Sequence, residues 1–220
     1  MPRIARTVAI GFPHHIVQRG NNREKIFFAQ ETRKKYLDLL KEHARKWDVH
    51  ILAYCLMTNH VHFLVRPDKV ESLGKMMQGL NVSYTRYINK RYKRTGRIFE
   101  GRYHSCIVDE EAYLWSVVRY IEQNPTRAKM VKKLEDYPYS SALAHLSGRK
   151  DEVLTEELFS APERLGYIEF MRGEIPSKEQ DNIRLSTRRG RPLGDDKFIS
   201  KIERMLNAIL RPKATGRPVK

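Results

Sequence analysis

The sequence predicts an α+β fold, in which helices pack on an antiparallel sheet of the ferredoxin-like type. Strand-like and helix-like segments follow one another in the order β-α-β-β-α-β-α, which is the order of a split β-α-β unit. The chain has 220 residues, 40% of them hydrophobic, which suffices for one core with an appendage. No apolar run approaches the ~20 residues that a membrane-spanning helix needs, so we expect no membrane partner.

Hydrophobic spacing locates the individual elements. The predicted strands are residues 14–19, 49–57, 60–65 and a stretch within 97–108, and the predicted helices are residues 31–47, 72–92 and 110–124. Thr58-Asn59 is a tight connection, so the second and third strands should form an antiparallel hairpin. Asp109 is a candidate N-cap, and Pro125 disfavours helical geometry at Asn124, so the third helix should end there.

His60 and His62 stand two residues apart in the apolar third strand. The period of two places both imidazoles on one face of the strand, while Val61, Phe63 and Val65 point to the other face. Two imidazoles side by side on a rigid strand form half of a metal site. A purely structural role for the pair is the alternative.

Tyr120 and Asn124 are four residues apart in the third predicted helix, so they share one helix face. The tyrosine hydroxyl is a candidate nucleophile, and the asparagine carbonyl is a candidate third ligand beside the two histidines. Ordinary packing is the alternative for the tyrosine. On a chain of net charge +16, the electrophile that fits best is a nucleic-acid phosphate.

Several blocks of the sequence resemble the single-tyrosine HUH transposases, in particular the branch of REP-associated tyrosine transposases. They occur in the family's order within residues 5–145. The blocks are residues 53–65 around His60 and His62, Gly101-Arg102-Tyr103, residues 120–128 from Tyr120 to Ala128, and Tyr137-Pro138-Tyr139-Ser140-Ser141. The pair Asn124-Pro125 is typical of the REP-associated branch, whereas insertion-sequence members more often carry glutamine at the position of Asn124.

The resemblance implies a ferredoxin-like catalytic domain and a specific reaction. Tyr120 would attack single-stranded DNA beside a REP-type hairpin, remain attached to the 5′ side of the break and free a 3′-OH. The phosphotyrosine keeps the bond energy, so rejoining needs no nucleotide cofactor. His60, His62 and Asn124 would hold a divalent ion, magnesium or manganese, of which manganese suits the mixed nitrogen and oxygen ligands better. Insertion-sequence relatives work as dimers that exchange their tyrosine helices, but the sequence shows no decisive interface pattern, so both a monomer and a homodimer stay open.

Composition and charge indicate which kind of molecule the protein binds and in which cellular compartment it works. The net charge of +16 and a pI near 9.9 favour a polyanion. The first residues have no apolar core of a secretion signal, and Cys55 and Cys106 form no C-x-x-C pair. We therefore expect a cytoplasmic protein without a structural zinc site.

The last third of the chain consists of an acidic segment followed by a basic one. Residues 150–182 hold nine acidic and four basic residues, whereas residues 184–220 hold eleven basic and three acidic ones. We predict an HUH domain at residues 1–148, an acidic connecting segment at 149–183 and a basic DNA-binding tail at 184–220. The tail contains a short amphipathic helix at residues 195–210, flanked by two Gly-Arg-Pro triplets that resemble minor-groove hooks. A solvated basic tail is the alternative.

Arginines in four places are the candidate DNA contacts: the turn after the first strand, the end of the second helix, the segment after Tyr120 and the tail. They are Arg19, Arg23, Arg91, Arg94, Arg97, Arg127, Arg191 and Arg217. Two rival functions stay open. One is an RRM-like protein that binds single-stranded nucleic acid without cutting it, and the other is a water-dependent phosphoesterase, for which Asp68 is the carboxylate closest in sequence.

Overall fold

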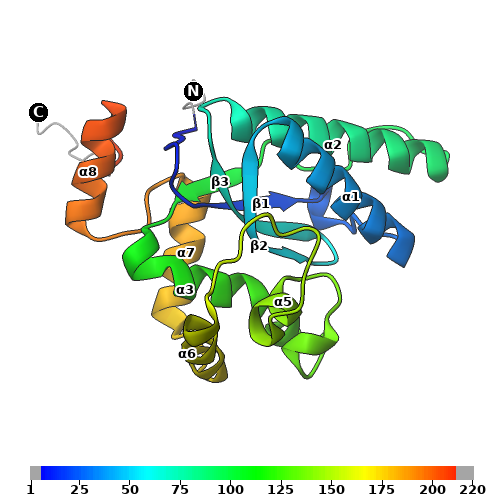
Figure 1. Cartoon of the computed structure of the whole chain (residues 1–220). Coiled ribbons are helices and arrows are strands. Elements are labelled where there is room, and N and C mark those ends of the chain that lie inside the picture. Colours follow the sequence, from blue (N-terminus) through cyan, green and yellow to red (C-terminus); the bar gives the residue numbers. More distant parts are fainter. Residues whose placement is uncertain (1–5, 212–220) are drawn as a thin grey trace, which may run out of the picture.

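The computed structural model of the chain describes residues 6–211 and contains one sheet of four antiparallel strands. The strands are β1 (His14–Arg19), β2 (Val49–Leu56), β3 (His60–Pro67) and β4 (His104–Ile107), in the spatial order β2-β3-β1-β4. All pairs are antiparallel, and β2 and β3 form the expected hairpin. The prediction of an α+β, ferredoxin-like fold is confirmed (Figure 1).

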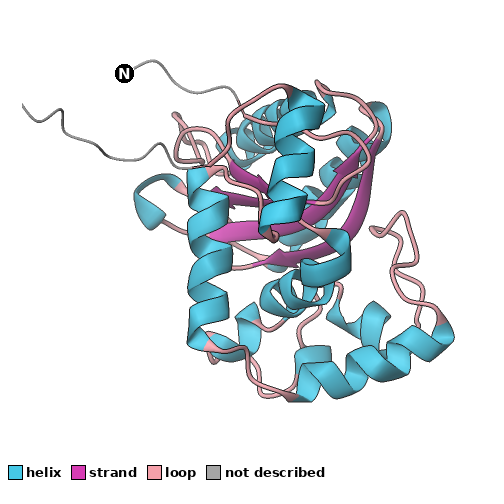
Figure 2. Cartoon of the chain, turned by 90° about the vertical axis from the view of Figure 1, so that its left-hand side faces the viewer, coloured by secondary structure: helices cyan, strands magenta, loops and turns pink. Residues whose placement is uncertain are grey.

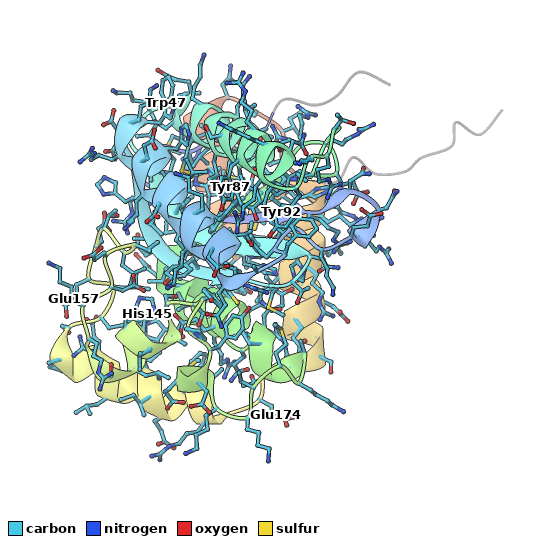
Figure 3. The ribbon with its side chains drawn as sticks, turned by 90° about the vertical axis from the view of Figure 1, so that its right-hand side faces the viewer. Trp47, Tyr87, Tyr92, His145, Glu157 and Glu174 are labelled. Carbon is cyan, nitrogen blue, oxygen red and sulfur yellow. The ribbon has the colours of Figure 1, made fainter. Side chains whose placement is uncertain are left out.

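One face of the sheet is covered by α1 (Gln30–Lys46) and α2 (Ser72–Arg91). Apolar side chains fill this interface: Tyr36 and Tyr84 meet edge to face at 4.9 Å, and Phe63 of β3 stacks against Tyr36. In Figure 3, Trp47, Tyr87 and Tyr92 mark this upper layer. Burial of this continuous apolar surface is the main source of stability for this half of the molecule.

The opposite face is covered by α3 (Glu110–Glu122) and α7 (Ser177–Arg189), with α5 (Ala142–Ser147) and α6 (Ala161–Arg172) farther from the sheet (Figure 2). Leu64, Val117 and Ile183 belong to the apolar core on this side. His145, Glu157 and Glu174 mark this lower layer in Figure 3. Helices thus cover the sheet on both sides.

The register of β3 separates its side chains as the period of two predicts. His60 lies opposite Arg19, and His62 lies opposite Val17 of β1. Val61, Phe63 and Val65 all belong to the core under α1 and α2, and Leu64 belongs to the core under α3. The two histidines therefore face α3, on the side away from the larger aromatic core.

The end of α3 differs in detail from the sequence-based prediction. Asp109 caps the helix as predicted, since its side chain accepts a hydrogen bond from the backbone N–H of Glu111 at 3.2 Å. The helix ends beside the predicted site, but Asn124 does not leave helical structure: it begins the short helix α4 (Asn124–Arg127). Proline is tolerated in a first helical turn, where its missing N–H would have no partner, so Pro125 fits there.

The region after residue 148 is more structured than a connecting segment. It forms α6, α7 and α8 (Asp196–Leu206), of which the sequence predicted only α8. The remaining short elements are the single turns η1 (Asn21–Arg23) and η2 (Leu134–Asp136). Phe198 and Ile202 of α8 pack against Ala9 and Ile107, so α8 is anchored beside β4. Cys55 and Cys106 are free thiols, both buried. Within residues 6–211, no helix combines the length and apolarity needed to cross a bilayer.

Candidate functional site

A cavity of about 1370 Å³ opens between the sheet, α3 and α7. His60, His62, Tyr120 and Asn124 all line it, so the four residues predicted from the sequence come together at one place. Ten arginines also line the cavity: Arg6, Arg19, Arg23, Arg102, Arg127, Arg184, Arg188, Arg189, Arg191 and Arg211. Glu100 is the one carboxylate among the described lining residues, so the cavity suits a polyanion.

The ring of Tyr120 lies edge-on against His62 and against His15 of β1. The ring centroids of His60 and His62 are 5.0 Å apart, and the Tyr120 ring lies 5.7 Å from the ring of His62, nearly perpendicular to it. Only 5% of Tyr120 is exposed, because α3 holds its ring between the imidazoles and a guanidinium. The nucleophile candidate and the two ligand candidates thus belong to the same chain and share one wall of the cavity.

Two arginines make the surroundings of Tyr120 positive. The guanidinium of Arg127 lies 4.6 Å from the centre of the Tyr120 ring. Arg184 lines the same cavity, and its interaction with Tyr120 is the main cause that raises the pKa of Arg184 above its ordinary value. Positive charge at this distance stabilises negative charge on a phenolic oxygen or on a nearby phosphate.

Asn124 is held at the junction between α3 and α4. Its amide nitrogen donates to the carbonyl oxygens of Tyr120, at 2.9 Å, and of Ile121, at 3.2 Å. Its amide oxygen accepts from Arg127 Nη2 at 3.0 Å and keeps a second lone pair. Because the nitrogen is directed at the helix end, the oxygen is the atom left to face a ligand.

The tautomer of His60 follows from its neighbours. Asn59 donates from its amide nitrogen to the carbonyl oxygen of Arg23 at 2.9 Å, which leaves the amide oxygen of Asn59 to face His60 Nδ1 at 2.7 Å. His60 Nδ1 therefore carries the proton, and Nε2 has its lone pair free. Burial lowers the pKa of His60 to about 4, with a smaller contribution from Arg19, so the ring is neutral near pH 7.

His62 has its Nδ1 3.0 Å from Nε2 of His15, on the neighbouring strand. Its pKa lies well below the ordinary value, first because of burial and then because of the positive charge that His60 would add. Neutral imidazole is the form that binds metals. Within the described residues, no group of three or more His, Cys, Asp or Glu side chains has a metal-binding arrangement, so a site here would need the amide of Asn124 or ligands from a substrate.

The predicted DNA contacts fall into three groups. Arg19, Arg23, Arg127 and Arg191 line the cavity. A second group, Arg91, Arg94 and Arg97, lies at the end of α2 and in the loop after it, outside the described cavity lining; Arg94 stacks over Phe28 at 5.5 Å. Arg217 and the second Gly-Arg-Pro triplet lie outside the described residues.

Sequence reasoning missed three residues of this site. His15 lies in the strand predicted at residues 14–19, and its position two before Val17 puts it on the same face as the residue opposite His62. Arg184 and Thr187 were missed because α7 was not predicted, although a spacing of three residues is the mark of one helix face. All three line the cavity.

Comparison with known proteins supports the family suggested by the motifs. Residues 11–124 match the model of the family described as Transposase IS200 like. A protein of Haemophilus influenzae named "Putative REP-associated tyrosine transposase" is 23% identical over 125 residues, which cover 52% of this chain and 68% of that protein.

A solved structure shares the fold. The structure of a REP-associated tyrosine transposase bound to a REP hairpin aligns with a TM-score of 0.57 and 16% identity, over 74% of this chain and 96% of that one. Because the family model covers more than half of the chain, the chain belongs to the IS200-like transposase family, which confirms the resemblance drawn from its motifs and the prediction of a DNA strand-transferring enzyme.

Proposed function

We propose that this transposase cuts and rejoins single-stranded DNA beside a hairpin, with Tyr120 as the nucleophile. The observation that carries the proposal is the position of Tyr120, 5.7 Å from the ring of His62 and inside a cavity lined by ten arginines. A phenol buried against two neutral imidazoles and approached by two guanidinium groups is poorly explained by packing alone.

The reaction requires one bond to form and one to break at the phosphorus atom. The oxygen of Tyr120 attacks the phosphorus, the bond from phosphorus to the 3′ oxygen breaks, and the proton lost by the phenol is balanced by the proton gained by the leaving 3′ oxygen. Arg184 and Arg127 stabilise the negative charge on the attacking oxygen and the phosphate. Attack by a 3′-OH on the 5′-phosphotyrosine reverses the step and rejoins DNA without a nucleotide cofactor.

A divalent ion, magnesium or manganese, fits the side chains at this place. His60 and His62 each have a hydrogen bond on Nδ1 that leaves Nε2 free, and Asn124 keeps a lone pair on its amide oxygen. These three atoms would hold the ion. When bound, it would supply a positive charge that polarises a phosphate oxygen and orients it for in-line attack.

The DNA partner is proposed from charge and from the relatives. The relative in the aligned structure is bound to a REP hairpin. In this chain Arg19 and Arg23, at the end of β1 and in η1, and Arg191, just after α7, line the same cavity, where they would contact a phosphate backbone. A hairpin with a single-stranded flank is the DNA form that would supply both a duplex for the rim and a flexible strand for the centre.

The two rival functions have less support. An RRM-like protein stacks bases on an open sheet face, but α1, α2, α3 and α7 cover this sheet on both sides. A phosphoesterase that uses water needs a carboxylate near the metal. Asp68, the candidate, accepts a hydrogen bond from His50 at 2.9 Å, beyond the opposite end of β3 from His60.

Covalent trapping tests the proposal. The wild-type chain should form a band with single-stranded DNA on a denaturing gel in the presence of manganese, and chelator should abolish the band while sparing most DNA binding. Tyr120→Phe removes one oxygen and should abolish the adduct at unchanged binding. Tyr103→Phe and Tyr113→Phe are matched controls that should retain it. An adduct that survives in Tyr120→Phe would assign the nucleophile to another tyrosine.

A further inference from the structure

Three consecutive hydrogen bonds connect His62 of β3, through His15 of β1, to α7. His62 Nδ1 lies 3.0 Å from His15 Nε2, and His15 Nδ1 lies 2.8 Å from the hydroxyl of Thr187. The Thr187 hydroxyl lies 2.8 Å from the carbonyl oxygen of Ile183, one helical turn earlier. All three side chains in the line are at most 3% exposed, so water does not compete for these bonds.

The direction of each bond follows from counting protons. Thr187 has one hydroxyl proton and donates it to Ile183, so its oxygen can only accept from His15. His15 then carries its proton on Nδ1 and offers a lone pair on Nε2. His62 must donate to that lone pair from Nδ1, which leaves its own Nε2 without a proton and turned to the cavity.

The geometry of the two rings agrees with this assignment. The planes of His15 and His62 differ by 6°, and their centroids are 5.3 Å apart. A centroid separation so much larger than the 3.0 Å between the bonded nitrogens means that the rings meet edge to edge in nearly one plane. That is the arrangement of a straight N–H···N hydrogen bond.

We infer that Thr187 is a positioning residue that, acting through His15, holds His62 in the tautomer with a free Nε2. The inference rests on the proposed metal site, because a free Nε2 is what a metal ligand requires. Asn59 does the same for His60 from within the hairpin. The two candidate metal ligands are thus oriented by different residues: His60 by its sequence neighbour Asn59, and His62 by Thr187 of α7 through His15.

The consequence concerns the C-terminal part of the chain. Thr187 lies 172 residues from His15 in sequence and outside residues 11–124, which match the family model. Residues after 148 would therefore help to build the catalytic centre in addition to any role in DNA binding. A truncation before α7 would disturb His62 as well as remove positive charge.

Thr187→Val is the decisive variant, because valine keeps the shape of threonine but cannot accept a hydrogen bond. Without that acceptor, His15 is free to carry its proton on Nε2 and donate to His62, which would place a proton on Nε2 of His62. Long-range nitrogen–proton correlation spectra of the metal-free protein distinguish the two tautomers. His60 is an internal control in the same spectrum, Thr187→Ser should restore the wild-type tautomer, and Ser186→Ala controls for packing of α7.

Manganese titration is the second measurement. Loss of a group that orients a metal ligand typically weakens metal binding by about 10–100-fold, so Thr187→Val should fall in this range and Thr187→Ser should stay near wild type. A Thr187→Val protein that folds, keeps the Nδ1–H tautomer of His62 and binds manganese as tightly as wild type would overturn the inference. Since the tautomer is read without metal, failure of the wild-type chain to bind manganese would instead overturn the metal role proposed above.

Discussion

The two faces of the sheet are built from the same four strands but in opposite ways. The face under α1 and α2 is closed by large apolar side chains such as Phe63, Tyr36 and Tyr84. The face under α3 and α7 buries His15 and His62 at the edge of a cavity. Consecutive residues of one strand, His62 and Phe63, therefore belong to two different environments.

The difference shows how the fold separates stability from chemistry. Buried imidazoles contribute less to stability than apolar side chains of the same size, because they must keep hydrogen-bond partners. The molecule compensates with a continuous apolar core on the far side of the same strands. Substitutions of the buried histidines should therefore change catalysis at little cost in stability, and substitutions in the apolar core under α1 and α2 should do the reverse.

The largest effect is expected for His62→Leu. Loss of an imidazole from the proposed metal site should lower the rate of DNA cleavage by roughly a thousandfold or more, since groups that merely orient such ligands already cost about 10–100-fold. The free energy of unfolding should fall by only about 1–3 kcal/mol, because His15 alone loses a partner. Adduct formation on denaturing gels and chemical unfolding measure the two quantities. Cleavage within tenfold of wild type would contradict the division between the faces.

Phe63→Ala is the matched variant one residue away. Removal of this fully buried ring should lower the free energy of unfolding by about 3–5 kcal/mol. Where the variant is folded, its cleavage rate should remain near that of wild type, because Phe63 points away from the cavity. A folded Phe63→Ala protein that cleaves as poorly as His62→Leu would show that the two faces are coupled.

Local patterns in the sequence were enough to predict most of the candidate site. The period of two placed His60 and His62 on one face, and the spacing of four placed Tyr120 and Asn124 together, because both patterns are set by backbone geometry. A local signal for α6 was also present: Ser160 and Glu163 form a capping box with a proline between them. The acidic composition of residues 149–183 instead predicts a connecting segment, so composition and the capping box indicate different structures there.

The contacts of α7 were beyond such reasoning. The hydrogen bond between His15 and Thr187 joins residues 172 positions apart. The spacing of hydrophobic residues predicts that a helix forms, but it does not predict which face of a distant sheet that helix will cover. The same holds for Arg184 beside Tyr120. The proposed division into a catalytic domain, an acidic connection and a DNA-binding tail remains a prediction, and α7 packs against β4 and β1 across that division.

The next effect concerns His14, the neighbour of His15 on the other side of β1. His14 Nδ1 donates to the carbonyl oxygen of Phe12 at 2.8 Å, and Nε2 accepts from the N–H of Ala9 at 3.2 Å. Burial lowers its pKa to about 4 from 6.5. The unfolded chain therefore binds more protons between these values, so the contribution of His14 to stability is complete above pH 6.5 and is lost as the pH falls toward and through 4.

The shift corresponds to about 3 kcal/mol, by the usual conversion of pKa differences to free energy. Glutamine offers one donor and one acceptor in a similar arrangement but does not titrate. Unfolding curves of His14→Gln between pH 4 and 7 should therefore show a flatter pH dependence than those of wild type. Parallel curves would mean that other groups, such as His60, account for the acid sensitivity of the wild-type chain.

The smallest effect is expected at the rim of the cavity, for Arg191→Ala. Arg191 follows Gly190, whose positive φ of 68° ends α7 and turns the chain along the cavity. One phosphate contact accounts for about one unit in the slope of log affinity against log salt concentration, so the variant should bind hairpin DNA with a slope smaller by about one. Arg172→Ala removes an exposed arginine of α6 that lies outside the described cavity lining, and its slope should equal that of wild type. Equal slopes for Arg191→Ala and wild type would show that Arg191 does not contact the DNA backbone, and the phosphate contacts would then have to come from other arginines of the cavity, such as Arg19 and Arg23.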